Sequence, residues 1–330
     1  MKTKRIVLMI ALTISVNCIA DQNIRQVGTL TQIEGKVTLF TNPEKSLGKV
    51  IQNTLPHALF ENEYYAVKEA QISDVVEEGN IIRTAVGAKA KIVFDNGDQY
   101  MIGSGTAYRV HWNVNPANPD TQLKLMHGKL RGVINKNGPR GKLTIRTRAA
   151  TMGVRGTDFY IGDSDEGVGT QVTILRGEVS LKPVSEKAQT VTIKSGFSGE
   201  VQKEQTLTAK PNVVDVRKAT KEDLVVVHDC SKIKPEPQKE KLPEPIKQKI
   251  ELLEKKCTEA TLNAIKTEDP KLYAELNTKG IQSADEINMQ TVKQLFKEAP
   301  AAPKKKKPQE GELLKGLDPQ TYEKYFKALE

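Results

Sequence analysis

Between Gly79 and Val201 the sequence consists of short runs in which apolar and polar residues alternate, with turn residues between the runs. A period of two places successive side chains on opposite faces of a β-strand. Asp95-Asn96-Gly97-Asp98 separates two of these runs, and Asn-Gly favours a hairpin because both central residues of such a turn need positive φ. This region predicts a mainly β fold of short strands, arranged either in two layers or as a solenoid-like stack.

The alternation begins earlier, over residues 24–40, where apolar residues flank Gly35 and predict a hairpin. Residues 43–78 contain two prolines and an acidic stretch, and we expect a loop-like insertion there. A glycine preceded by a polar or charged residue and followed by a charged one leads into an alternating run at Gly35, Gly128 and Gly177. This recurrence predicts a repeated strand–turn–strand unit. We expect one β-domain over residues 21–202.

The first twenty residues have the layout of a secretory signal peptide. A basic start is followed by an apolar run over residues 6–16 and by Cys18-Ile19-Ala20, which offers small residues for cleavage. The run has about eleven residues, whereas a helix that crosses a bilayer needs ~20. We therefore expect residues 1–20 to be removed and the mature chain to reside in the periplasm, soluble or peripheral to a membrane. An uncleaved anchor is the alternative.

Positive charge is spread unevenly along the chain. The formal net charge is +9, and three positive charges lie in the predicted signal peptide. The segment from Thr121 to Thr157 has no acidic residue, so its lysines and arginines predict either an anion-attracting surface or solvated strand faces. Lipid head groups, cell-wall polymers or an acidic envelope protein would be the partners of such a surface, and nucleic acid is not expected.

Two cysteines remain after removal of the predicted signal peptide. Cys230 and Cys257 form an even pair, which in an oxidising compartment permits a disulfide. Two free or buried thiols are an equally good interpretation. The cysteines and histidines lack the spacing of metal ligands, so we expect no metal and no other cofactor.

Beyond about residue 231 the composition becomes charged and rich in proline, and residues 203–245 predict a linker. Three helix signals follow over residues 246–299. They are a helical spacing of apolar residues through Ile250, an Asp269-Pro270 start and a capping box at Ser283. A lysine- and proline-rich linker over 300–317 and a terminal helix over 318–330 complete a partly helical C-terminal extension.

Five motifs occur in order between Gly79 and Leu181. They are Gly79-Asn80-Ile81-Ile82-Arg83-Thr84, the turn that starts at Asp95, Gly128-Lys129-Leu130, Gly153-Val154-Arg155-Gly156-Thr157-Asp158-Phe159, and Arg176-Gly177-Glu178-Val179. In this order they resemble the FecR domain family, and the segment ending at Phe159 is the most diagnostic. Asn80 stands where the family usually has aspartate.

The resemblance implies a periplasmic, all-β module that binds a ligand or a partner protein without catalysis. The best known members of the family are membrane regulators, which join a cytoplasmic sigma-factor-binding segment to a periplasmic domain. Only about five residues precede the apolar run here, so we do not expect a sigma-factor-binding segment. The resemblance predicts the β-domain rather than the regulator architecture.

The family motif allows two interpretations of its residues. In one, Arg155 binds an anion or a carboxylate together with Arg146 and Arg148 on the neighbouring strand. In the other, which we favour, the motif is structural: its glycines allow tight turns, its threonine bonds the turn and its phenylalanine fills the core. The motif residues are Gly153, Arg155, Gly156, Thr157, Phe159 and Gly177.

No motif in the sequence supports an enzyme. The four histidines are scattered, and neither a nucleophile elbow nor a zinc-protease helix occurs. We expect an exported, non-enzymatic binding, scaffold or sensor module that uses the β-domain to bind a protein or an anionic ligand. In one alternative the basic helical tail anchors the protein to peptidoglycan, anionic lipid or a partner protein. A hydrolase using Ser104 or His127 is the alternative from another class.

Overall fold

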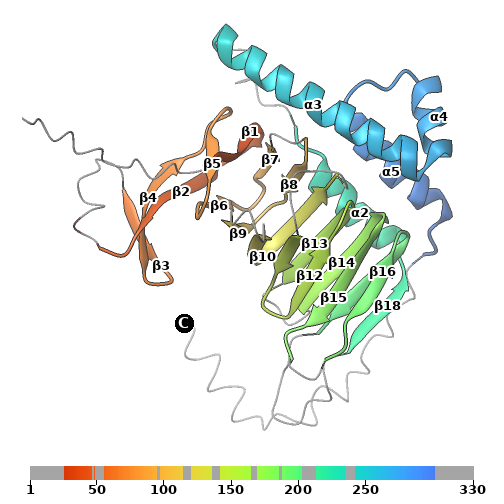
Figure 1. Cartoon of the computed structure of the whole chain (residues 1–330), viewed down its shortest axis with the longest axis horizontal. Coiled ribbons are helices and arrows are strands. Elements are labelled where there is room, and N and C mark those ends of the chain that lie inside the picture. The colour runs from red at the N-terminus through yellow and green to blue at the C-terminus, as the bar shows by residue number, and fades with distance from the viewer. Residues whose placement is uncertain are drawn as a thin grey trace, which may run out of the picture.

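The computed structural model describes residues 26–46, 48, 56–94, 97–113, 120–135, 142–164, 169–185, 188–202, 213–234 and 242–301. Two β-sheets pack face to face, and a layer of helices covers the outer face of one sheet (Figure 1). This confirms the predicted mainly β fold with two layers and a helical C-terminal extension. The predicted signal peptide, nearly all of the lysine- and proline-rich linker and the terminal helix lie outside the described residues.

Sheet A is antiparallel throughout. Its strands, in spatial order, are β5 (Val75–Glu77), β1 (Gln26–Glu34), β7 (Lys89–Val93), β8 (Gln99–Ile102), the second half of β10 (Asp120–Val133), β13 (Asp158–Ser164), β14 (Gly169–Arg176), β17 (Phe197–Val201) and β18 (Val214–Lys218).

Sheet B lies opposite and contains one parallel pair, β10 with β11. Its strands, in spatial order, are β3 (His57–Phe60), β4 (Glu63–Glu69), β2 (Val37–Glu44), β6 (Ile81–Thr84), β9 (Ala107–Asn113), the first half of β10, β11 (Lys142–Arg146), β12 (Ala150–Val154), β15 (Glu178–Pro183) and β16 (Val191–Lys194).

The chain passes repeatedly from one sheet to the other. The three recurring glycines predicted as strand–turn–strand units each mark such a crossing, with φ of +70 at Gly35, +99 at Gly128 and +78 at Gly177. The predicted hairpin over residues 24–40 is therefore wrong, because β1 pairs within sheet A and β2 within sheet B. Their apolar side chains face each other across the core instead of lying side by side.

Gly128 shows why a crossing needs glycine. At this residue β10 leaves sheet B and enters sheet A. A Cβ atom at Gly128 would lie 2.4 Å from Thr106 Cα, and its positive φ is unfavourable for other residues. One long strand can therefore serve both sheets.

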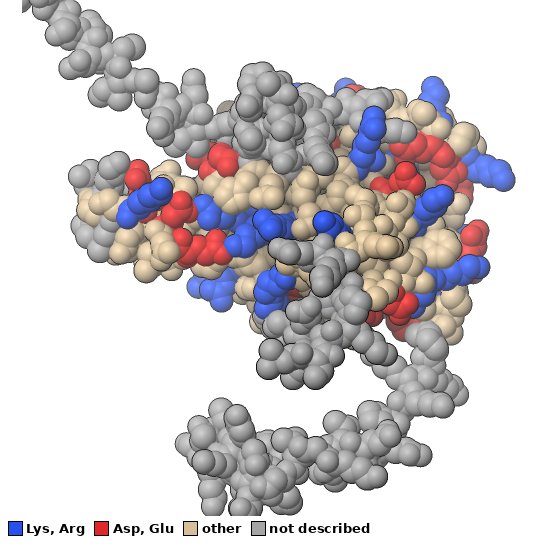
Figure 2. All heavy atoms as spheres, turned by 60° about the horizontal axis from the view of Figure 1, so that its bottom comes forward, with Lys and Arg blue, Asp and Glu red and all other residues tan. Residues whose placement is uncertain are grey.

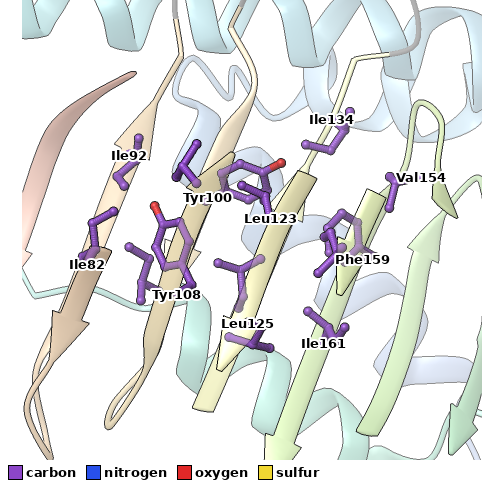
Figure 3. Packing of buried hydrophobic residues seen from close by; sticks show 14 of the residues in the cluster. Ile82, Ile92, Tyr100, Tyr108, Leu123, Leu125, Ile134, Val154, Phe159 and Ile161 are labelled. Carbon is purple, nitrogen blue, oxygen red and sulfur yellow. The ribbon is translucent and has the colours of Figure 1, made fainter. Parts of the chain in front are cut away.

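The core lies between the two sheets. The predicted alternation over residues 88–94 places Ala90, Ile92 and Phe94 in this core, and Phe94 packs edge to face on Tyr100 at 4.9 Å. Side chains from neighbouring strands meet in one apolar layer (Figure 3). Each fully buried aliphatic or phenyl side chain contributes about 1.5–3 kcal/mol by leaving water.

Two predicted irregular segments contain regular structure. The predicted insertion over 43–78 forms β3, β4 and β5, and its acidic residues lie on the sheet surface, where Glu61 and Glu63 pair with Arg109. The predicted linker over 203–245 contains β18 and the helix α2 (Lys221–Ser231). A capping box between Thr220 and Asp223 starts that helix.

The remaining helices are α3 (Glu244–Glu268), α4 (Pro270–Thr278) and α5 (Ala284–Glu298). The predicted helix starts are confirmed, because Asp269 caps α4 and Ser283 caps α5 through their side chains. α3 has 25 residues. Within the described part of the chain, none of the helices combines the length and the apolar character needed to cross a membrane.

Candidate functional site

The motif around Arg155 forms the crossing from β12 to β13. Gly156 has a φ of +64, and the buried Thr157 hydroxyl donates a hydrogen bond to the Glu178 carbonyl at 2.9 Å. Phe159 is fully buried in the core between the sheets. Gly156, Thr157 and Phe159 therefore act as structural residues, as the favoured interpretation holds.

Gly177 forms a second crossing directly beside this one. A Cβ atom at Gly177 would lie 2.7 Å from the Gly156 carbonyl oxygen. The two turns thus pack backbone against backbone, which only glycine permits at this distance and at a φ of +78. This contact brings the two most specific motifs of the sequence to one end of the molecule.

A cavity of about 1150 Å³ lies at this end. Its floor is formed by the two turns and by the outward faces of β12, β15 and β16, and its wall is formed by the end of α3 and by parts of α4 and α5. It is the joint product of the β-domain and the helical extension. The cavity is large enough for a ligand of several linked residues, because drug-sized ligands occupy about 300–1,000 Å³.

The floor of the cavity carries two rows of side chains across neighbouring strands. Gly153 is in register with Ser180, which is in register with Thr192, and this row is small and polar. A Cβ atom at Gly153 would lie 2.5 Å from Ser180 Oγ, so glycine keeps the floor open. In the next row Glu178 is in register with Lys194.

Arg155 extends that charged row. It directly follows β12 and is exposed. Within the described part of the chain, the side chains of Arg155, Glu178 and Lys194 take part in no ion pair. Three unpaired charges at one cavity are available to a ligand.

An ion pair joins the floor of the cavity to its wall. Arg176, at 7 % exposure, forms an ion pair with Glu268 at the end of α3. The neighbouring Asp269 carboxylate accepts a hydrogen bond from the Leu272 amide and is used as a helix cap. The cavity thus contains groups of both signs, with the free basic groups on its floor.

Known proteins match this part of the chain. Residues 80–220 match the family model described as FecR protein. This segment therefore resembles a FecR domain. The match confirms the predicted resemblance and extends beyond the predicted motif range of 79–181, up to the residue before α2. FecR domains are typical of regulatory or sensor modules of the bacterial envelope.

Two crystal structures of a "putative anti-sigma factor" from Parabacteroides distasonis ATCC 8503 resemble the chain in part. The first, at 2.50 Å resolution, is 14% identical, with a TM-score of 0.34 over 42% of this chain and 59% of that chain. The second, at 1.65 Å, is 14% identical, with a TM-score of 0.36 over 44% of this chain and 64% of that chain. The chain thus spans less than two thirds of either relative. A comparison with curated proteins found no match.

The FecR domain does not bring the three predicted binding arginines together. Arg146 is in register with Thr151, four residues before Arg155, which separates them by roughly 13 Å along the strand. Arg148 pairs with Asp163 at 3.0 Å. Of these three arginines, only Arg155 lines the cavity. The predicted cluster of three is therefore wrong, and Arg155 alone remains a candidate binding residue.

The predicted one-sign surface over residues 121–157 is also not formed by the described residues. Acidic residues outside the segment neutralise part of it: Asp158, which directly follows it, binds Arg131, and Glu61 binds Lys124. Figure 2 shows basic and acidic side chains interspersed on one face of the molecule.

Both remaining cysteines are free and buried. The Cys230 thiol donates a weak hydrogen bond to the Met101 carbonyl at 3.6 Å, whereas Cys257 packs against Val93 and Leu253. Burial raises the pKa of each thiol to about 12. Of the two alternatives for this pair, the structure has the buried thiols and not the disulfide.

The residues considered for a hydrolase lie apart from the cavity. Ser104 lies in the turn between β8 and β9, where its hydroxyl accepts a hydrogen bond from the Gly87 amide at 2.7 Å. His127 lies in β10 beside the crossing at Gly128. Neither residue lines the cavity.

Sequence reasoning missed the buried basic residues of the FecR domain. Lys91 and Arg131 lie on strand faces that the alternation assigns to solvent, yet both side chains have 0 % exposure. Helices from the C-terminal extension cover them. No local signal could have shown this, because the partners of Lys91 are 163 and 194 residues away.

Proposed function

We propose that the protein is an exported, non-enzymatic sensor or scaffold module of the cell envelope, which binds a carboxylate-bearing peptide or protein segment in the cavity at the FecR signature. One observation carries the proposal: the most diagnostic motif of the domain places Arg155, with no ion-pair partner in the described chain, in the lining of a cavity of about 1150 Å³. The predicted signal peptide supports the location in the periplasm.

The charged row supports the class of ligand. Two free basic side chains, Arg155 and Lys194, lie on either side of the strand that carries Glu178. A ligand with carboxylates separated by an amine or amide would meet this order of charges. Hydrogen bonds between ionised groups are about twice as strong as neutral ones, and arginine binds a carboxylate through two parallel bonds.

The small polar row supports an extended ligand. Gly153, Ser180 and Thr192 leave a low floor that offers two hydroxyl groups. A peptide backbone can lie on such a floor and use both hydroxyls, while its acidic groups reach the neighbouring charged row. We place no catalytic step in this cavity.

In the alternative function, the C-terminal helices anchor the protein, and the fold limits which of their surfaces are available for this. The buried faces of α3, α4 and α5 pack within the protein, although Leu252 of α3 and Phe296 of α5 are exposed. In this docked arrangement, anchoring would use the exposed faces of these helices or residues after 301, which lie outside the described chain.

Site-specific crosslinking in the native envelope tests the proposal. A photoreactive residue replaces exposed Thr192 on the cavity floor, and a second version replaces exposed Arg83 on β6 as a control. We expect Thr192 to capture an envelope protein or peptide that Arg83 does not capture. Arg155→Glu should abolish the capture, whereas Arg146→Glu, on the same hairpin but away from the cavity, should not. Identical products at both positions, or only cytoplasmic partners, would overturn the proposal.

A further inference from the structure

The face of sheet A that meets the helices is unusually polar for a buried surface. Lys91 on β7 is fully buried, and its Nζ donates to Glu254 of α3 at 2.6 Å and to Asp285 of α5 at 2.7 Å. Gln32 on β1 donates to the same Asp285 at 2.7 Å. Gln99 on β8 accepts a hydrogen bond from the Asn288 amide of α5 at 3.1 Å.

Two further basic residues on this face also bind the helices. Arg131 on β10 donates two hydrogen bonds to Asp158, at 2.9 and 2.7 Å, and a third to the Asn288 backbone carbonyl of α5 at 3.1 Å. Arg176 at the end of β14 binds Glu268 of α3. Lys91 and Arg176 therefore meet carboxylates of α3 and α5, whereas the carboxylate partner of Arg131 lies on β13 of the same sheet.

Apolar contacts between these layers fall into two small clusters. One joins Tyr160 and Leu175 of sheet A to residues of α2 and to Val292 of α5. Val93 is the one sheet residue in a small cluster with Leu253, Cys257 and Ala284. The core between the sheets, in contrast, is one continuous cluster of apolar side chains. An antiparallel sheet normally shows a polar face to water or to a partner and an apolar face to its core.

Buried ion pairs fix how two surfaces fit but add little net stability, because the loss of hydration offsets the attraction between the charges. The FecR match also ends at residue 220, before the first helix. The helices are thus appended to a domain whose sheet A already has the composition of a partner-facing surface.

We propose that the helix-facing side of sheet A is a docking surface for helical segments that present carboxylates to it, and that residues 242–301, with α3, α4 and α5, occupy it as a detachable intramolecular partner. When this segment leaves, the two sheets keep their core, Arg131 keeps its ion pair with Asp158 of β13, and Lys91 becomes available to a carboxylate-bearing helix of another envelope protein. This surface meets the signature cavity at Arg176, and the same helices form the wall of that cavity, so their release would also open the cavity.

α2 belongs to the sheet and not to the detachable segment. Its Asp223 is held by Arg217 of β18 at 2.9 Å and by Gln171 of β14 at 2.8 Å, and the Ser198 hydroxyl of β17 also donates to it, at 3.1 Å. Three strands thus fix the start of this helix. The detachable segment also contacts α2, because Val292 packs on it and the Lys221 amide donates to the Pro300 carbonyl at 3.0 Å. Release of α3, α4 and α5 would break these contacts while α2 stays on the sheet.

The detachable segment and α2 each contain one buried thiol, which allows a direct test in the full chain. Cys257 lies in α3 with 0 % exposure and Cys230 lies in α2 with 1 % exposure. The labelling rate of each thiol by a maleimide is measured under native conditions with site-resolved mass spectrometry, and is divided by its rate in the unfolded chain. We expect Cys257 to react at least roughly tenfold faster than Cys230, since local opening needs less free energy than global unfolding.

Ionic strength and two variants make the test decisive. Raising the salt concentration, and separately Asp285→Asn, should speed the labelling of Cys257 and leave Cys230 unchanged, because both weaken the ion pairs with Lys91. Glu275→Gln, which breaks an exposed pair with Lys279 within α4, is the matched control and should change neither rate. The proposal is overturned if both thiols react at one rate, equal to that of global unfolding and insensitive to salt and to Asp285→Asn.

Discussion

The two interfaces of this molecule differ in composition although both are buried. Between sheets A and B the contacts are almost entirely apolar and form one continuous cluster. Between sheet A and the helices, fully buried Lys91 binds Glu254 and Asp285, and fully buried Arg131, which is paired with Asp158 of its own sheet, reaches the Asn288 carbonyl of α5. Apolar burial gives strength without direction, whereas buried charge gives direction with little net strength. We infer a permanent sandwich and a removable helical cover.

The largest expected effect comes from the sandwich itself. Phe159→Ala removes a fully buried ring from the core and should lower the free energy of unfolding by about 3–5 kcal/mol, measured by urea titration. Both thiols should then become reactive together, because the whole domain opens. Phe159→Leu should lose clearly less. A small loss for Phe159→Ala would contradict the assignment of this core as the main source of stability.

The sheet crossings provide the next largest effect. Gly128→Ala places a methyl group 2.4 Å from the Thr106 backbone at a φ of +99, and should lower the free energy of unfolding by about 2–3 kcal/mol. Gly87→Ala is the matched control, because it also has positive φ but no atom within 4 Å of the added Cβ. It should lose about 1 kcal/mol. Equal losses would show that backbone strain alone, and not the close approach of β10, matters at the crossing.

The charged interface should respond differently from the core. Lys91→Met removes the buried cation and leaves Glu254 and Asp285 partly exposed, at 21 % and 43 %. Water can reach both carboxylates, so we expect the substitution to cost only about 1–2 kcal/mol. This loss should affect only the docking of the helices α3, α4 and α5 on sheet A. Thiol labelling at Cys257 should rise while the urea midpoint of the sheet stays nearly unchanged. An equal loss of stability between the two sheets and between sheet A and the helices would contradict the distinction between these interfaces.

Acid should weaken the fixed helix α2. Burial opposes ionisation of Asp223, but hydrogen bonds from Arg217, Thr220 and Ser198 outweigh it and hold the pKa of this carboxyl below its ordinary value of 3.8. A lowered carboxyl pKa stabilises the fold above the ordinary value and loses that contribution as the pH falls through the folded value. The free energy of unfolding should therefore drop below about pH 4. Asp223→Asn should be less stable at neutral pH and should flatten this dependence.

The smallest expected effect on stability belongs to the ligand cavity. Arg155 is exposed and has no ion-pair partner among the described residues, so Arg155→Ala should change the free energy of unfolding by less than about 0.5 kcal/mol. The same variant should lose most of the crosslink from Thr192. If Arg155→Ala is stable and the crosslink from Thr192 is undiminished, Arg155 takes no part in binding.

The sequence predicted what depends on local pattern. Period-two alternation placed Ile92 and Phe94 in the core, and capping residues placed the starts of α4 and α5 at Asp269 and Ser283. The helix α2 had an equally readable signal in Thr220 and Asp223, which was overlooked within a charged segment.

What the sequence could not give depends on contacts between distant residues. Alternation is identical for two strands of one hairpin and for two strands in opposite sheets, so β1 and β2 were wrongly paired. The burial of Lys91 depends on acids in α3 and α5. The cavity depends in the same way on Glu268 and Leu272 meeting the FecR signature, so only Arg155 of the predicted binding arginines could be placed there.

Native-state hydrogen exchange on the full chain tests the difference between the two interfaces most directly. Exchange of individual amides is followed at low denaturant concentrations, at low and at high salt. We predict that amides of α3 and α5 exchange through an opening of lower free energy than that of β10 and β13, and that salt lowers it further. If the amides of the helices and of the strands instead exchange with one common free energy of opening at low and at high salt, the helical layer is a permanent part of the fold.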